Sequence, residues 1–198
     1  MRELAGGKLR LDEPAPAVAR LTIANEAKRN ALDHEILAAL ASVLGDGLEA
    51  RCLLITATGS TFSAGYDIGA LAGDTFAADA EAIVAHPFAA AIEALDAYPF
   101  PVLAALNGHA IGGGLELAIS CDLRICSDGA RLGMPPARLG LVYSHTGLRK
   151  FLDAAGSTSP TSPQSSASAA PIARAVKNSS RVRGAPTASR NFRSPVWE

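Results

Sequence analysis

The sequence predicts a layered α/β fold, and three observations lead to this expectation. Apolar segments of strand length alternate with amphipathic segments of helix length up to about residue 156. Hydrophobic residues make up 48% of the chain, which is enough for a sizeable core. The length of 198 residues fits one domain, or one domain followed by a tail.

A strand and a helix are expected first. Residues 18–24, VARLTIA, alternate between apolar and polar side chains as a half-buried strand does. After EAKRNALD, Asp33 is the expected N-cap of a helix that begins HEILAALASVL. Five apolar residues recur there at helical spacing and form the expected buried stripe: Ile36, Leu37, Leu40, Val43 and Leu44.

The same alternation continues along the chain. RCLLITATG, from Arg51, predicts a central strand, and the loop STFSAGYDIGAL follows it. Residues 77–97 predict a second helix that ends before YPFP, and VLAAL predicts the next strand. A glycine-rich loop then leads into a helix at LELAISC, and DLRICSD and ARLGMP predict two short strands. No repeat of roughly 20–50 residues indicates a solenoid.

The composition changes after Gly156, so we divide the chain into a core of residues 1–156 and a tail of residues 157–198. The tail holds ten serines and five prolines, and its six Lys or Arg face a single acid, Glu198. It shows almost no apolar periodicity, which predicts a disordered or loosely attached segment. The alternative is a basic tail for an acidic partner, although its cations have no aromatic residues interleaved with them.

The net charge, the cysteines and the N-terminal sequence argue against several classes of protein and of binding site. The net charge of −1 gives no electrostatic argument for nucleic acid or for an anionic membrane. Cys52, Cys121 and Cys126 lack metal-ligand spacing, so we expect no metal site and interpret them as reduced core thiols. No secretory h-region and no run of ~20 apolar residues is present. We therefore expect a cytoplasmic protein that binds neither nucleic acid nor membrane.

The stretch NGHAIGGGLELA, residues 107–118, follows a strand and enters a helix. A phosphate-binding loop is one interpretation, although the spacing fits neither GxGxxG nor GxxxxGK[ST]. Tight packing of the helix on the strand is a second. The third is an anion hole, in which unsatisfied N–H groups at the helix N-terminus meet a developing negative charge.

A second loop favours the anion hole. FSAGYDI, residues 62–68, also follows a strand and also places small residues before a turn. Two such loops on neighbouring strands can each direct one N–H at a single oxygen. This arrangement stabilises an enolate or a tetrahedral oxyanion.

Four segments of the sequence are RNALD, FSAGYDI, NGHAIGGGLELAISCDLRI and LGMPPARLGLVY. In their order and spacing, these segments together resemble the enoyl-CoA hydratase/isomerase (crotonase) superfamily. The resemblance runs from about residue 8 to Gly156. It implies a crotonase-like spiral of ββα units and an enzyme that stabilises the enolate of an acyl-CoA thioester, hydrating or isomerising an enoyl-CoA. Coenzyme A is then part of the substrate, no further cofactor is implied, and the family's homotrimers or hexamers are the expected assembly.

The resemblance also implies roles for single residues. The oxyanion-hole amides fall on Tyr66 and Gly113, and the first catalytic glutamate falls on Glu116. The alternative interpretation of Glu116 is a solvated helix glutamate. Substrate contacts fall on nine further positions: Lys28, Arg29, Ala31, Ala64, Asp67, Ile68, Gly112, Pro135 and Pro136. For Lys28 and Arg29 the alternative is surface cations before a helix, and Asp67 is equally explained as a turn former.

One departure from the family pattern concerns the second glutamate of the hydratases, because that position is Pro136. A single Glu116 still permits isomerisation, while hydration through two carboxylates is not available in its usual form. LGLVYSHTG resembles the malonyl-type CoA decarboxylases of the superfamily, which carry a tyrosine at the position of Tyr143; a packed aromatic is the alternative for this residue. A non-catalytic remnant that binds acyl-CoA is the remaining hypothesis.

Members of the family run longer than this chain, and their C-terminal helices close the CoA site and build the trimer. Here the resemblance ends near KFLDAAG, and the Ser/Pro/Arg-rich tail begins. We therefore expect a truncated relative or a frameshifted reading frame, with the trimer in doubt.

Overall fold

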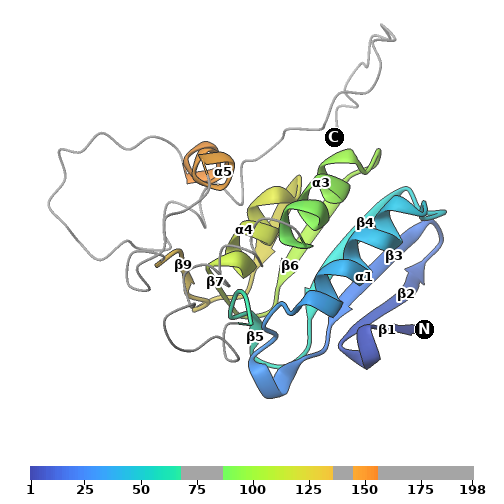
Figure 1. The fold of residues 1–198 in the computed structure, drawn as a ribbon, viewed down its shortest axis with the longest axis horizontal. Coiled ribbons are helices and arrows are strands. Elements are labelled where there is room, and N and C mark those ends of the chain that lie inside the picture. The colour runs from blue at the N-terminus through green and yellow to red at the C-terminus, as the bar shows by residue number, and fades with distance from the viewer. Residues whose placement is uncertain (68–86, 136–144, 156–198) are drawn as a thin grey trace, which may run out of the picture.

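A computed structural model describes residues 1–67, 87–135 and 145–155. Its strands form two sheets (Figure 1). The larger sheet has six strands in the order β1-β2-β3-β4-β6-β8, and the smaller has three in the order β5-β7-β9. The strands are β1 (Arg2–Leu4), β2 (Leu9–Ala15), β3 (Val18–Ile23), β4 (Cys52–Ala57), β5 (Thr61–Ser63), β6 (Val102–Leu106), β7 (His109–Ile111), β8 (Leu123–Cys126) and β9 (Leu132–Gly133).

The described part of the chain contains three copies of one ββα unit. In each unit the first strand joins the larger sheet, the second joins the smaller sheet, and a helix follows. The units are β4-β5 with α3 (Ala89–Ala97), β6-β7 with α4 (Gly113–Ser120), and β8-β9 with α5 (His145–Ala155). Strands β3, β4, β6 and β8 pair in parallel, as do β5, β7 and β9, so equivalent loops of successive units lie side by side.

The helices line up along one face of the larger sheet, where Figure 1 shows α1 (His34–Gly45), α3 and α4 next to one another. The Asp33 side chain caps α1 by accepting a hydrogen bond of 2.9 Å from the Ile36 N–H. The buried residues of α1 are the five that helical spacing predicts: Ile36, Leu37, Leu40, Val43 and Leu44. Two short 3₁₀ turns, η1 (Ala5–Gly7) and η2 (Glu26–Lys28), precede α1.

A row of side chains in register crosses the sheet on its helix-facing side. Leu21 of β3 pairs with Ile55 of β4, Ile55 with Ala104 of β6, and Ala104 with Arg124 of β8. All four are buried, so the row ends in a buried guanidinium. That cation lies where the C-terminal end of α4 presents its carbonyl groups, because Arg124 Nη1 donates to the carbonyl oxygens of Ala118, Ile119 and Cys121.

The structure departs from the sequence expectations in several places. Strands β1, β2, β5 and β7 and helix α5 were not expected. The helix expected over 77–97 is observed as α3, Ala89–Ala97, and residues 77–86 lie outside the described part of the chain. The expected tail, 157–198, also lies outside it.

The expectation that the cysteines are buried in the core is confirmed for one of the three. Cys121 is buried, whereas Cys52 and Cys126 are only half-buried, and none of the three forms a disulfide with a described residue. Burial raises the pKa of the Cys126 thiol, and the neighbouring Asp128 charge adds to this effect. Within the described residues, no helix is both long and apolar enough to cross a bilayer.

Candidate active site

The first wall of the candidate site is the turn that follows β5. Gly65 has a positive φ of 98°, which favours glycine, and its N–H donates to the buried Ser63 hydroxyl at 3.1 Å. The turn then pairs with the segment before α1. The Leu32 N–H donates to Gly65 O at 2.7 Å, and the Asp67 N–H donates to Leu32 O at 3.0 Å. This pairing fixes the backbone on both sides of Tyr66.

The pairing also sets the direction of the Tyr66 N–H. Consecutive N–H groups of an extended chain point to opposite sides. The Asp67 N–H points toward Leu32, so the Tyr66 N–H points away from it. No residue within the described ranges accepts a hydrogen bond from this N–H.

The second wall is the glycine-rich turn between β7 and α4. The Gly112 N–H donates to Gly133 O of β9 at 2.9 Å, and Gly112 has a φ of 54°. Helix α4 begins at Gly113, so the Gly113 N–H lies in the first turn, where no intrahelical acceptor exists. Among the described residues it has no hydrogen-bond acceptor.

The two walls are in contact. A Cβ atom on Gly65 would lie 2.9 Å from Ile111 O and 3.3 Å from Gly113 N. A Cβ atom on Gly114 would lie 2.5 Å from the Ser63 Cβ. The glycines therefore allow two loops, one from each of two successive units, to approach each other through their backbones.

Glu116 lies one helical turn beyond Gly113, and it is only 6% exposed. Every residue of α4 is buried, so this carboxylate faces the protein interior and not solvent. The Tyr66 hydroxyl donates to Glu116 Oε2 at 3.3 Å. The interpretation of Glu116 as a solvated helix glutamate is therefore wrong, and a buried carboxylate lies next to both turns.

The Tyr66 ring fills the space that Gly113 leaves open. A Cβ atom on Gly113 would lie 2.7 Å from Cε1 and 2.8 Å from Cζ of that ring. Phe88 also packs against this ring in an edge-to-face contact, with a centroid distance of 4.9 Å. Burial raises the pKa of the Tyr66 phenol well above its ordinary value, and the Glu116 charge adds to this shift.

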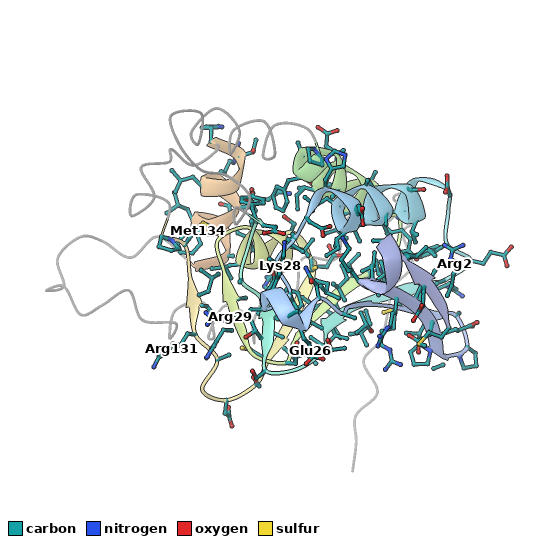
Figure 2. All side chains as sticks on the ribbon, turned by 60° about the horizontal axis from the view of Figure 1, so that its bottom comes forward. Arg2, Glu26, Lys28, Arg29, Arg131 and Met134 are labelled. Atoms are coloured by element: carbon teal, nitrogen blue, oxygen red, sulfur yellow. The ribbon has the colours of Figure 1, made fainter. Side chains whose placement is uncertain are left out.

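Lys28 and Arg29 differ in their surroundings, although both extend from the turn at η2 (Figure 2). Lys28 Nζ forms an ion pair with the Asp67 carboxylate at 2.5 Å, which ties this turn to the turn after β5. Arg29 is exposed and has no ion pair to any described residue. Asp67 is therefore more than a turn former, because its side chain connects two segments of the site.

The other predicted positions divide into two groups. Ala31 is buried beside Leu32, Ala64 is exposed at the turn after β5, and Pro135 is half-buried just after β9. Ile68, Pro136 and Tyr143 lie outside the described residues.

Sequence reasoning missed Asn30, which fixes the turn before α1. Asn30 is 1% exposed, and its Nδ2 donates to Thr58 O at 2.8 Å and to Thr61 O at 2.7 Å. Its φ of 56° lies in the left-handed region, which asparagine tolerates better than most residues. The signal in the sequence was an asparagine in a turn before a capped helix, although that pattern alone did not show which loop it would bind.

Comparisons with known proteins agree with the sequence resemblance. The sequence model of the enoyl-CoA hydratase/isomerase family matches residues 13–159. The "Probable enoyl-CoA hydratase echA6" of Mycobacterium bovis is 37% identical over 145 residues, which cover 72% of this chain and 56% of that protein. The chain thus spans little more than half the length of the curated relatives that it matches first.

Two solved structures are also similar to this chain. DspI from Pseudomonas aeruginosa superimposes with a TM-score of 0.68 at 33% identity, over 76% of this chain and 57% of that one. A Thermobifida fusca YX protein that was solved in complex with acetoacetyl-CoA gives a TM-score of 0.64 at 34% identity. That match covers 77% of this chain and 64% of that protein.

Proposed function

Because the chain belongs to the enoyl-CoA hydratase/isomerase family and has its crotonase-like fold, we propose that it binds an acyl-CoA thioester and stabilises the enolate of that ester. In this proposal the N–H groups of Tyr66 and Gly113 donate to the thioester carbonyl oxygen. As the α-carbon loses or gains a proton, negative charge moves onto that oxygen. Donors that are already oriented stabilise this charge without reorganisation, and losing one donor typically costs about 3 kcal/mol.

The contact between Gly65 and Gly113 carries the proposal. It brings the backbones of two loops together, and each loop has an N–H without an acceptor among the described residues. An acyl oxygen placed between them would meet donors from both sides. Its negative charge would also lie at the positive end of the α4 dipole.

We assign proton transfer to Glu116, which is buried one turn beyond this pair of loops. In isomerisation, a carboxylate removes a proton from one carbon next to the double bond and returns it to the carbon at the far end. In hydration, a water oxygen bonds to the β-carbon and a proton reaches the α-carbon. A single carboxylate supports the first reaction directly, whereas hydration requires it to orient the water as well.

For the CoA moiety we assign Lys28 and Arg29, which extend from the turn at η2 as cations that can meet phosphates. The Thermobifida fusca protein, which was also solved in complex with CoA, supports this ligand class. The trimer or hexamer expected from the family stays a prediction, which sedimentation analysis tests.

The experiment is incubation of the purified chain with three CoA esters. Loss of enoyl absorbance with crotonyl-CoA indicates hydration, and gain of enoyl absorbance with a 3-enoyl-CoA indicates isomerisation. Release of CO₂ from methylmalonyl-CoA would favour decarboxylation, the hypothesis that depends on Tyr143. Tight binding of all three esters without turnover would contradict the enzymatic proposal and favour an acyl-CoA-binding remnant.

A further inference from the structure

The side chain of Tyr66 touches the carboxylate to which proton transfer is assigned. Its hydroxyl lies 3.3 Å from Glu116 Oε2, and it reaches across from the turn that also presents the Tyr66 N–H. We propose that this phenol is a positioning residue, which holds the Glu116 carboxylate in its working orientation. The inference rests on the proposed function, because it assigns a partner to the proton-transfer group.

The phenol is itself held in place. On one side its ring lies where a side chain on residue 113 would be, 2.7 Å from the position of such a Cβ. Phe88 also packs against the ring, edge-to-face at an interplanar angle of 89°. Because residues of two helical segments pack against it, the ring has little freedom to move, so its hydroxyl is a fixed donor.

The protonation state of the phenol suits this role. Burial raises its pKa, and the adjacent Glu116 charge raises it further, so the hydroxyl stays neutral at physiological pH. A neutral donor that binds a carboxylate stabilises the ionised form of that carboxylate. The ionised form is the one that removes a proton from the substrate.

Titratable side chains on the elements that pack against α4 either have partners of their own or are exposed. Asp96 of α3 pairs with Lys150 of α5 at 2.7 Å, and His109 Nδ1 on β7 accepts a hydrogen bond from the Arg131 N–H. On α5, His145, Arg149 and Asp153 are exposed. Tyr66 is a titratable group in direct contact with Glu116.

The test is Tyr66→Phe, which keeps the ring and its packing and removes only the hydroxyl. We expect kcat to fall roughly tenfold with a small change in KM, because the carboxylate gains orientations that do not react. We also expect the acid limb of the pH–rate profile to move up by about one pH unit, because the ionised carboxylate loses a donor.

Tyr98→Phe is the matched control. Tyr98 is also buried, and its hydroxyl donates to Ala50 O at 2.8 Å. Ala50 and Tyr98 lie before β4 and β6, whereas the two turns of the site follow β5 and β7. Its removal costs the same kind of hydrogen bond without touching Glu116. A merely structural role for Tyr66 would make the two variants alike in rate and in pH profile, and that result would overturn the proposal.

A second measurement does not depend on turnover. The carboxyl ¹³C resonance of Glu116, identified by its absence in Glu116→Gln, is followed against pH in the wild type and in Tyr66→Phe. A midpoint higher by about one pH unit in Tyr66→Phe supports the contact, and an unchanged midpoint overturns it. If the wild type turns over no CoA ester, the proposed function fails while this titration still decides the role of Tyr66.

Discussion

Gly65 lies so close to Gly113 that a Cβ atom on Gly65 would be 3.3 Å from the Gly113 nitrogen. The two glycines belong to successive ββα units, and the parallel pairing of β5 with β7 brings their loops together. The fold thus brings together two loops, each with an N–H that has no acceptor among the described residues. Three predictions concern the candidate site, and a fourth concerns the C-terminal end of α4.

Glu116→Gln is expected to lower turnover of an enoyl-CoA by at least about a hundredfold, because an amide cannot accept or return the proton. The Kd for the CoA ester should change by no more than severalfold, since the side chain keeps its size. Steady-state kinetics and calorimetry measure the two quantities. Glu93→Gln, on the exposed side of α3, is the control. A rate equal to that of the wild type would refute the assignment of Glu116.

Gly113→Pro is expected to abolish activity, because proline removes one of the two donors to the thioester oxygen. Proline is tolerated in the first turn of a helix, but any side chain here also meets the Tyr66 ring at 2.7 Å. Gly113→Ala separates these effects, since alanine has the same contact and keeps the N–H. The rates of the two variants are compared with the same ester. Equal loss in both would mean that ring displacement, and not the missing donor, explains the defect.

Lys28→Met is expected to weaken binding of a CoA ester roughly fivefold, because one cation near the phosphates is lost. The corresponding acyl-pantetheine lacks those phosphates, so its Kd should stay the same. Arg51→Met, which removes an exposed cation just before β4, is the control. If both ligands weaken equally, Lys28 acts only by holding Asp67, with which it pairs at 2.5 Å, and the phosphate contact is wrong.

Arg124→Met is expected to lower the free energy of unfolding by about 1–3 kcal/mol. Arg124 is 5% exposed, and its Nη1 reaches three carbonyl oxygens at the end of α4, the nearest being Cys121 O at 2.6 Å. Methionine fills the volume and leaves those carbonyls without their donor. Urea unfolding measures the change. Arg20→Met, which breaks the more exposed pair with Asp12, should cost no more than about 1 kcal/mol, and an equal cost for both variants would contradict this account.

Regular patterns made part of this fold predictable. The stripe of α1 and its Asp33 cap depend on residues a few positions apart, so the sequence displays them directly. The same holds for β4 and β6, whose buried residues alternate along each strand. The glycine-rich loop of the proposed anion hole was recognisable because its glycines cluster between a strand and a helix.

Contacts between distant segments were not predictable in the same way. Strands β5 and β7 have three residues each, too few for a visible alternation, and they form because they pair with each other. The burial of Arg124 has no signal in the sequence either, although its partners at the end of α4 lie only three to six positions before it. Nothing in FSAGYDI showed that the Tyr66 side chain would reach Glu116, fifty positions away. Such pairings depend on the tertiary fold.

The central claim is that Tyr66 and Gly113 donate to one thioester oxygen, and infrared difference spectroscopy tests it most directly. The ligand is butanoyl-CoA with ¹³C at its carbonyl carbon, which binds without reacting. Two donors should shift the carbonyl stretch to a lower frequency than in water, and Gly113→Pro should remove most of that shift. A bound carbonyl that vibrates at its frequency in water would contradict the claim.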